Sequence, residues 1–365
     1  MNPLPKTIQF LENGIQNGLH LGAQLAVSQQ GKLITSIAVG NTTTERAMTP
    51  QTLNLWLSTT KPITAVLLAQ LQEKNLLSWN DPVSHFLPEF AQKGKEPITL
   101  WNLLTHTGGF RGADAMWNAE PWDKIIDRIC TTPLEPRWVI GEKAGYHISG
   151  SWFILGEIIQ RITQRPFQDY VREELFLPLA MNDCWIGMGE REYQAYNLLR
   201  GELFVTENPP TIPHPHFNSP EAWLFCRPAS NGRGPMLQLL HFYEMLHHQG
   251  TFQGKTILQP QTVEDLTRRH RVGMFDNSFR QNIDWGLGFI HDSKENEGGH
   301  LVYGFGPHAT RETVGHSGSQ SSSAYLDRTH GLAVAWFCNG MPGEMLHQKR
   351  AHDLNACIYE DLGLT

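Results

Sequence analysis

The sequence predicts an α+β fold in which an antiparallel sheet is flanked by helices and a helical subdomain is inserted between the strands. Two observations support this prediction. The chain of 365 residues begins with a helical pattern followed by a hairpin pattern, and it ends with a hairpin followed by a helix. Between these ends the apolar residues have mostly helical spacing. The mirror-image order of the terminal elements predicts that their strands share one sheet.

The elements at the two ends have clear boundaries. Residues 5–18 place their apolar side chains on one face of a helix. Two strand-like runs follow, joined by the turn Gln29-Gln30-Gly31, and two more flank the turn Thr329-His330-Gly331 near the other end. The predicted strands are 24–28, 32–39, 323–327 and 332–338, and the predicted closing helix is 344–362.

The middle of the chain is predicted to be mostly helical. Two long loops rich in proline and aromatic residues, 108–124 and 200–234, interrupt it. Neither an internal repeat nor a linker of distinct composition is present, so we expect a single unit over 1–365, with 1–60 and 285–365 as a sheet subdomain and 61–284 as a helical one. The predicted helices of the middle segment are 63–74, 152–163, 167–175, 236–248 and 260–269.

Composition excludes several classes of function. The 29 Lys and Arg residues against 36 Asp and Glu residues give a formal net charge of −7. Because no excess of basic charge remains to contact phosphates, we expect no nucleic-acid partner. No apolar run reaches the roughly 18 residues that a bilayer-spanning helix needs, so we expect no membrane partner.

The cysteines and the N-terminus predict the compartment. The five cysteines are far apart and include no C-x-x-C spacing, which argues against a disulfide framework or a zinc knuckle. Polar residues interrupt the N-terminus too early for the apolar core of a secretory signal peptide. Neither histidine pair, 214/216 or 247/248, has a third ligand at metal-binding spacing, so we expect no metal. These features predict a cytoplasmic protein.

The strongest local signal for chemistry is the segment Ser58-Thr59-Thr60-Lys61. Pro62 suits the first turn of the apolar helix that follows, which places Ser58 at the N-terminus of that helix. Ser58 and Lys61 are three residues apart and therefore share one face. Serine becomes a nucleophile when a base takes its proton, and lysine can be that base if burial lowers its pKa. Alone, the pattern also fits a serine helix cap beside a solvated lysine.

Further segments accompany this pattern in a fixed order along the chain. They are Asp81-Pro82-Val83, Leu87-Pro88-Glu89-Phe90, the run from Ile98 to Gly109, Tyr146-His147-Ile148-Ser149, Trp285-Gly286-Leu287-Gly288-Phe289 and Gly315-His316-Ser317-Gly318-Ser319. Together with the Ser58 segment, they resemble the motifs of the serine β-lactamase and penicillin-binding-protein-like hydrolases, specifically the class C-like esterase and β-lactamase-related branch. The resemblance covers nearly the whole chain. It implies a β-lactamase/transpeptidase-like fold and no cofactor.

The resemblance also implies catalytic roles. Ser58 would attack an acyl carbonyl, while Lys61 and Tyr146 would share the general-base and general-acid steps. Tyr146 could act as a phenolate only if its surroundings lower its pKa. The backbone amides of Ser58 and Ser319 would bind the oxyanion.

Two departures from the β-lactamase pattern bear on the substrate. His316 occupies the position where penicillin-recognising enzymes usually have lysine, and a mostly neutral histidine binds a carboxylate poorly. Ser149 replaces the usual asparagine and lies one position further from the tyrosine. Both departures favour ester or amide acyl transfer over β-lactam turnover. We expect His316, Ser149 and Gly318 to contact the substrate, with Gly318 admitting its backbone closely.

Two expectations concern other aromatic side chains. Tryptophans in loops often line pockets, which predicts an aromatic acyl or aryl pocket, whereas Trp152 and Trp336 are predicted to lie in the core. His106 is predicted to end a helix, with its ring bonded to a loop backbone. The expected pocket tryptophans are Trp117, Trp122, Trp138 and Trp223.

The sequence therefore predicts a serine hydrolase that acts on a small-molecule carboxylic ester through a covalent acyl-serine intermediate. An acyltransferase, a D-amino-acid amidase or peptidase, and a weak β-lactamase would use the same intermediate and remain alternatives. A protein that keeps the fold only as a binding scaffold is a further alternative, since fold alone does not establish activity.

Overall fold

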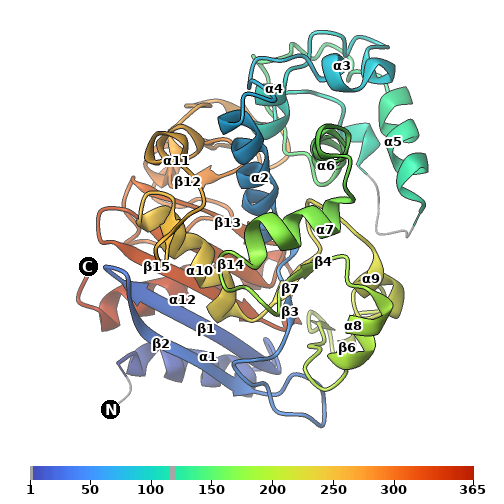
Figure 1. The fold of residues 1–365 in the computed structure, drawn as a ribbon. Coiled ribbons are helices and arrows are strands. Elements are labelled where there is room, and N and C mark those ends of the chain that lie inside the picture. The colour runs from blue at the N-terminus through green and yellow to red at the C-terminus, as the bar shows by residue number, and fades with distance from the viewer. Residues whose placement is uncertain (1–2, 115–119) are drawn as a thin grey trace.

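A six-stranded antiparallel sheet forms one half of the molecule in the computed structural model, which describes residues 3–114 and 120–365 (Figure 1). The strands are β1 Gly22–Gln29, β2 Lys32–Gly40, β12 Ile290–His291, β13 Thr313–Gly318, β14 Ser322–Asp327 and β15 Leu332–Cys338. Their order across the sheet is β12-β13-β14-β15-β1-β2. Leu25 of β1 lies opposite Trp336 of β15 in an antiparallel pair. The prediction that both chain ends share one sheet is therefore confirmed.

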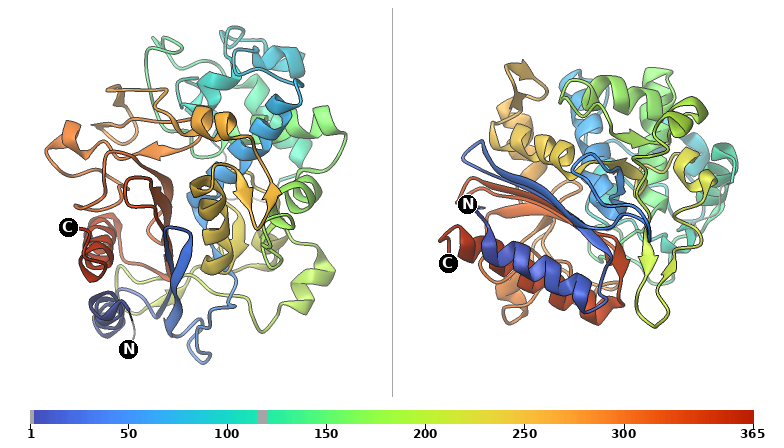
Figure 2. Two further views of the ribbon diagram at one scale, coloured as in Figure 1. Left: turned by 60° about the vertical axis from the view of Figure 1, so that its left-hand side comes forward. Right: turned by 90° about the horizontal axis from the view of Figure 1, so that it is seen from below.

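Helices cover both faces of this sheet (Figure 2). The terminal helices α1 (Pro5–Gln16) and α12 (Glu344–Asp361) lie side by side on one face, and α10 (Met236–His247) packs on the other. Because both faces are covered, every residue of β15 is buried, and the strand reads as a continuous apolar run. Successive side chains still alternate between the two cores, with Trp336 on the side of α12 and Phe337 on the side of α10.

The other half of the molecule is mostly helical. Its centre is α2 (Lys61–Glu73), whose side chains are buried on nearly every face because α6 (Gly150–Thr163), α11 (Pro260–Thr267) and the sheet surround it. The remaining helices are α3 Val83–Phe86, α4 Leu100–Leu104, α5 Trp122–Thr131, α7 Phe167–Val171, α8 Glu190–Ala195 and α9 Pro220–Leu224. Short 3₁₀ turns are η1 Leu57–Thr60, η2 Pro88–Phe90, η3 Arg111–Ala113 and η5 Lys294–Glu297, and a π-type turn η4 spans Arg172–Phe176.

Short strands within the long loops pair with one another. They are β3 Asn54–Leu55, β4 Trp185–Ile186, β5 Phe204–Val205, β6 Ile212–Pro213, β7 Gly232–Gly234, β8 Thr251–Phe252, β9 Lys255–Thr256, β10 Phe275–Asp276, β11 Gln281–Asn282 and β16 Gly340–Met341. One of the three-stranded sheets, β3-β7-β4, ties the strand before the Ser58 turn to the predicted loop 200–234. Among the described residues, no helix has the length and apolar composition needed to cross a membrane.

Two details differ from the sequence prediction. The helix predicted over 167–175 is α-helical only to Val171 and continues as the π-type turn η4. Helix α10 belongs to the predicted helical segment 61–284, yet it packs against β1, β14 and β15 of the sheet. Apolar spacing identified α10 as a helix, but spacing does not determine which element the apolar face will meet. The division into two subdomains stays a prediction.

Candidate active site

Ser58 lies in the turn η1, immediately before the first turn of α2. The preceding residue, Leu57, has a φ of 51°, in the left-handed region that side chains other than glycine rarely adopt. Such backbone strain costs on the order of 1–3 kcal/mol and persists only where surrounding contacts enforce it. Here the Thr60 hydroxyl donates to the Leu57 carbonyl at 2.6 Å, which closes the turn that presents Ser58.

Gly318, at the end of β13, makes this turn possible. A Cβ at Gly318 would lie 2.3 Å from the carbonyl oxygen of Trp56 and 2.3 Å from Ser322 Oγ. The strand therefore packs directly on the backbone of the Ser58 turn, and only glycine permits that approach. We expected Gly318 to admit the substrate backbone. The contact between β13 and η1 is sufficient to explain the glycine, and the contact with substrate stays a prediction.

Substituting Gly318 by alanine is expected to destabilise the protein and to disturb Ser58 together. The methyl group must displace the Trp56 backbone as well as the Ser322 side chain, so we expect a loss of about 1–3 kcal/mol in the free energy of unfolding and slower acylation of Ser58. Urea unfolding and the rate of labelling by a fluorophosphonate measure the two effects. Gly112→Ala is the control, because a Cβ there meets only a Thr132 methyl at 3.8 Å. Equal results for both variants would contradict this account.

Lys61 is fully buried beside Ser58. Its Nζ lies 3.1 Å from Ser58 Oγ, 3.0 Å from the Ile148 carbonyl oxygen and 3.2 Å from the Ala229 carbonyl oxygen. Carbonyl oxygens can only accept, so they engage two N–H groups of the amine. In the neutral amine, the lone pair is then left facing the Ser58 hydroxyl. This is the geometry that a general base needs.

The surroundings of Lys61 favour that neutral form. Burial lowers the pKa of Lys61 from 10.5 to about 7, and the nearby Asp114 carboxylate opposes this shift only in part. The amine also lies over the rings of Tyr146 and Trp152, 4.9 and 5.6 Å from their centroids. A large fraction of Lys61 is therefore unprotonated near neutral pH, as a base must be.

Tyr146 also contacts Ser58, because its hydroxyl is hydrogen-bonded to the Ser58 side chain. Burial raises the pKa of Tyr146 far above its usual range, so this residue is a phenol at neutral pH. A phenolate general base is thus not favoured, whereas the phenol form can donate a proton. The sequence left this choice open because it depends on burial.

A buried ion pair fixes Tyr146 in place. Arg271 and Asp276 lie 3.1 Å apart, with side chains that are 0% exposed. Asp276 accepts hydrogen bonds from the backbone N–H groups of Tyr146 at 3.1 Å and of Phe279 at 3.2 Å. Sequence reasoning missed both residues of this pair, because their contacts span distant segments and no local pattern marks them.

Ser58 and Tyr146 open onto a cavity of about 360 Å³. The cavity is lined by Leu57, Ser58, Tyr146, Ile148, Ser278, Phe279, Ile290, Tyr303, His316, Ser317 and Ser319. None of these side chains carries a charge at neutral pH, because burial lowers the pKa of His316 well below its usual value. The cavity therefore suits a neutral substrate.

The remaining predicted residues divide into two groups. His316 and Ser319 line the cavity, with His316 Nδ1 2.8 Å from the Ser317 carbonyl oxygen and the Ser319 side chain hydrogen-bonded to Tyr303. Ser149 is not among the lining residues and lies at the start of α6, where its backbone N–H donates to Asp114. Of the motif from Tyr146 to Ser149, Ile148 contacts the cavity in place of Ser149.

The expected tryptophan pocket is wrong for the described residues. Trp138 borders a separate hollow of about 400 Å³, and Trp122 borders another of about 630 Å³. Trp223 is buried against Arg233, whose guanidinium lies 4.0 Å from its ring centroid, and Trp117 lies outside the described residues. Loop composition indicated aromatic side chains but not the path of the loops, which takes these rings away from Ser58.

His106 and the core tryptophans follow the prediction. His106 comes just after α4 with a φ of 59°, and its Nδ1 accepts from the backbone N–H of His147 at 3.0 Å. The ring thus joins the end of a helix to the Tyr146 segment, as expected of a structural histidine. Trp152 and Trp336 are both 0% exposed.

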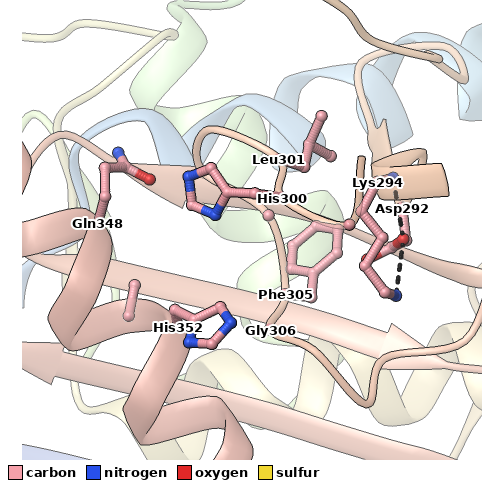
Figure 3. Close-up of a pocket in the computed structure, with 11 residues that line it drawn as sticks. Asp292, Lys294, His300, Leu301, Phe305, Gly306, Gln348 and His352 are labelled. Atoms are coloured by element: carbon pink, nitrogen blue, oxygen red, sulfur yellow. Dashed lines mark hydrogen bonds and ion pairs between the residues drawn. The ribbon is translucent and has the colours of Figure 1, made fainter. Parts of the chain in front are cut away.

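A much smaller cavity lies between the loop after β12 and helix α12 (Figure 3). It encloses about 10 Å³, close to the minimum for one water molecule. The ion pair between Lys294 and Asp292, at 3.0 Å, lies at its edge. This cavity is too small for an acyl substrate. The hollows beside Trp138 and Trp122 are not lined by Ser58, so the space in front of Ser58 is the candidate site.

Known proteins are similar to this chain in sequence and fold. A family model described as Beta-lactamase matches residues 8–356. The esterase EstB of Burkholderia gladioli is 25% identical over 358 residues, which cover 89% of this chain and 88% of EstB. A penicillin-binding protein homologue from Caulobacter crescentus is 25% identical with a TM-score of 0.79, and coverage is 99% of this chain and 98% of that one.

A family VIII carboxylesterase also has the same fold, with 24% identity, a TM-score of 0.81, and coverage of 99% of this chain and 98% of that one. The predicted β-lactamase/transpeptidase-like fold is confirmed. The chain belongs to the Beta-lactamase family and is a serine hydrolase.

Proposed function

We propose that this protein hydrolyses a neutral carboxylic ester through an acyl group held covalently on Ser58. The observation that carries the proposal is the placement of the buried Lys61 amine, 3.1 Å from Ser58 Oγ. Two carbonyl oxygens accept hydrogen bonds from its N–H groups. The relationship to the esterase EstB supports an ester substrate.

The geometry supports a balanced sequence of proton transfers. In acylation, Lys61 takes the Ser58 proton and Ser58 Oγ bonds to the acyl carbon, while Tyr146 gives its proton to the departing alcohol oxygen as it receives one from Lys61, so Tyr146 remains a phenol. In deacylation, water attacks the acyl carbon and its proton passes through Tyr146 to Lys61, which returns a proton to Ser58 Oγ. The backbone amides of Ser58 and Ser319 would bind the oxyanion in both steps.

Incubation with p-nitrophenyl butyrate tests this proposal. Release of nitrophenol, with a transient mass increase of one butyryl group on the intact protein, is the expected result. Parallel reactions with nitrocefin and with a D-alanine amide compare the alternative substrates, and added alcohol tests acyl transfer. Faster turnover of nitrocefin or of the amide than of any ester would overturn the proposal.

Phe279 is expected to determine the preference for the acyl group. Its ring lies 4.8 Å from that of Tyr146 at the wall of the cavity. Because Phe279→Ala removes apolar contact area without touching Ser58, we expect KM for benzoyl esters to rise roughly tenfold with little change in kcat. Steady-state kinetics with benzoyl and acetyl esters measure this.

Phe275→Ala is the matched control for this prediction, since Phe275 is 43% exposed and borders a different hollow. An unchanged KM for benzoyl esters in Phe279→Ala would show that the acyl group occupies another part of the cavity.

We also propose a reducing, cytoplasmic location. All five cysteines are free, and Cys130, Cys184 and Cys338 among them are buried. Unpaired buried thiols are typical of proteins from reducing compartments. Fractionation of the native host cells tests the location.

A further inference from the structure

Asp114 makes an unusual set of contacts beside the candidate site. Its carboxylate accepts the backbone N–H of Ile148 at 2.8 Å through Oδ2, and those of Ser149 at 2.8 Å and Gly150 at 2.6 Å through Oδ1. These amides form the N-terminus of α6, where the Ser149 side chain provides no cap. Asp114 therefore caps the helix from a distant segment of the chain.

The contact reaches Lys61 through a single peptide group. The Ser149 N–H, which Asp114 binds, belongs to the same planar peptide as the Ile148 carbonyl, which accepts from Lys61 Nζ at 3.0 Å. In a trans peptide these two groups point in opposite directions. Asp114, the peptide and Lys61 thus form a continuous hydrogen-bonded chain, in which each bond polarises the next.

We propose that Asp114 is a positioning residue for acylation. It fixes the peptide between Ile148 and Ser149, and the carbonyl of this peptide holds the Lys61 amine so that the nitrogen lone pair faces Ser58. The inference rests on the proposed function, because it assigns a role within the same Ser58 chemistry. It adds a residue that lies outside the three sequence motifs.

The other groups that face Lys61 are neutral, so the effect of the Asp114 charge on Lys61 can be distinguished from theirs. The rings of Tyr146 and Trp152 pack against the amine, and His106 and His316 face it as neutral rings, because burial lowers the pKa of both histidines. Among the described residues, Asp114 is the anion that raises the pKa of Lys61 against the effect of burial. Loss of this charge lowers the pKa of Lys61. A loosened fold that admits water to the amine instead raises this pKa toward its usual value.

The pH dependence of Asp114→Asn therefore separates positioning from general stability. We expect kcat/KM to fall at least tenfold through kcat, with KM within about twofold of the wild type. We also expect the acidic limb of the pH profile to move to lower pH by on the order of half a unit. An unchanged kcat, or an acidic limb moved to higher pH, would overturn the proposal.

The pH dependence of fluorophosphonate labelling repeats this test without any ester substrate. It reports the Lys61-assisted reactivity of Ser58, so failure of the proposed ester hydrolysis is distinguishable from failure of the role of Asp114. If Asp114→Asn does not fold, Asp114→Glu is tested instead. We expect it to retain the wild-type acidic limb and lose kcat, because the extra methylene displaces the carboxylate. Wild-type kcat in Asp114→Glu would then overturn the proposal.

Asp361→Asn is the matched control. Asp361 also binds a helix N-terminus from a distant segment, accepting from the backbone N–H groups of Lys6 at 3.2 Å and Thr7 at 2.8 Å in α1. It lies at the terminal helices on the outer face of the sheet. We expect Asp361→Asn to lower the melting temperature while the acidic limb and kcat stay at their wild-type values.

Discussion

Substituting Ser58 by alanine is expected to abolish the acyl adduct and to lower kcat/KM by roughly 10³-fold or more. The strained Leu57 turn presents the Ser58 hydroxyl to both Lys61 and Tyr146, and alanine offers no oxygen that could form the acyl bond. Intact mass after brief exposure to an activated ester, followed by peptide mapping, locates the modified residue.

Ser278→Ala is the control for this experiment. Ser278 lines the same cavity, but its hydroxyl donates to the Tyr146 carbonyl oxygen and accepts from Arg111 instead of contacting Lys61. The variant is expected to form the adduct. An adduct that persists in Ser58→Ala would place the nucleophile on another residue and remove the basis of the proposed function.

The parts of the fold that could be predicted from sequence depend on local patterns. The terminal hairpins have apolar runs separated by short polar or glycine-containing turns, and these signals lie within about fifteen residues. The mirrored element orders of the two ends predicted that they share one sheet, and the structure shows that they meet through the pairing of β1 with β15. The position of α10 could not be predicted from the sequence, since its apolar residues would suit any apolar partner.

The residues of the candidate site likewise include some that a local pattern marks and others that it does not. Ser58 and Lys61 share one turn of the chain, so their spacing alone brings the two groups together. Asp114, Asp276 and Tyr303 reach the site through contacts between distant segments, and no local spacing marks them. The proton affinities of Lys61 and Tyr146 depend on burial by the whole fold. Sequence therefore indicated the candidate groups, whereas the lowered pKa of Lys61 and the raised pKa of Tyr146 come from their burial in the structure.

Substituting Lys61 by methionine is expected to lower kcat/KM by roughly 10³-fold at pH 8, since the Ser58 hydroxyl then has no base. Wild-type activity is expected to fall as the pH decreases through about 7, where Lys61 becomes protonated. Lys61→Arg is the charged comparison, because a guanidinium donates hydrogen bonds but does not lose its proton at this pH. Wild-type kcat/KM in either variant, or a flat wild-type profile between pH 5 and 9, would exclude Lys61 as the base.

The same burial links Lys61 to stability. The pKa of Lys61 is about 7 in the folded protein and 10.5 as the reference value for an unfolded chain, so between these values the unfolded chain binds more protons. The contribution of Lys61 to the free energy of unfolding therefore becomes more favourable as pH rises from about 7 toward 10.5. Urea unfolding at pH 7 and pH 9 should show this gain in the wild type and a smaller one in Lys61→Met. Equal gains would mean that Lys61 is already charged in the folded protein at neutral pH, and a charged amine cannot take the proton of Ser58.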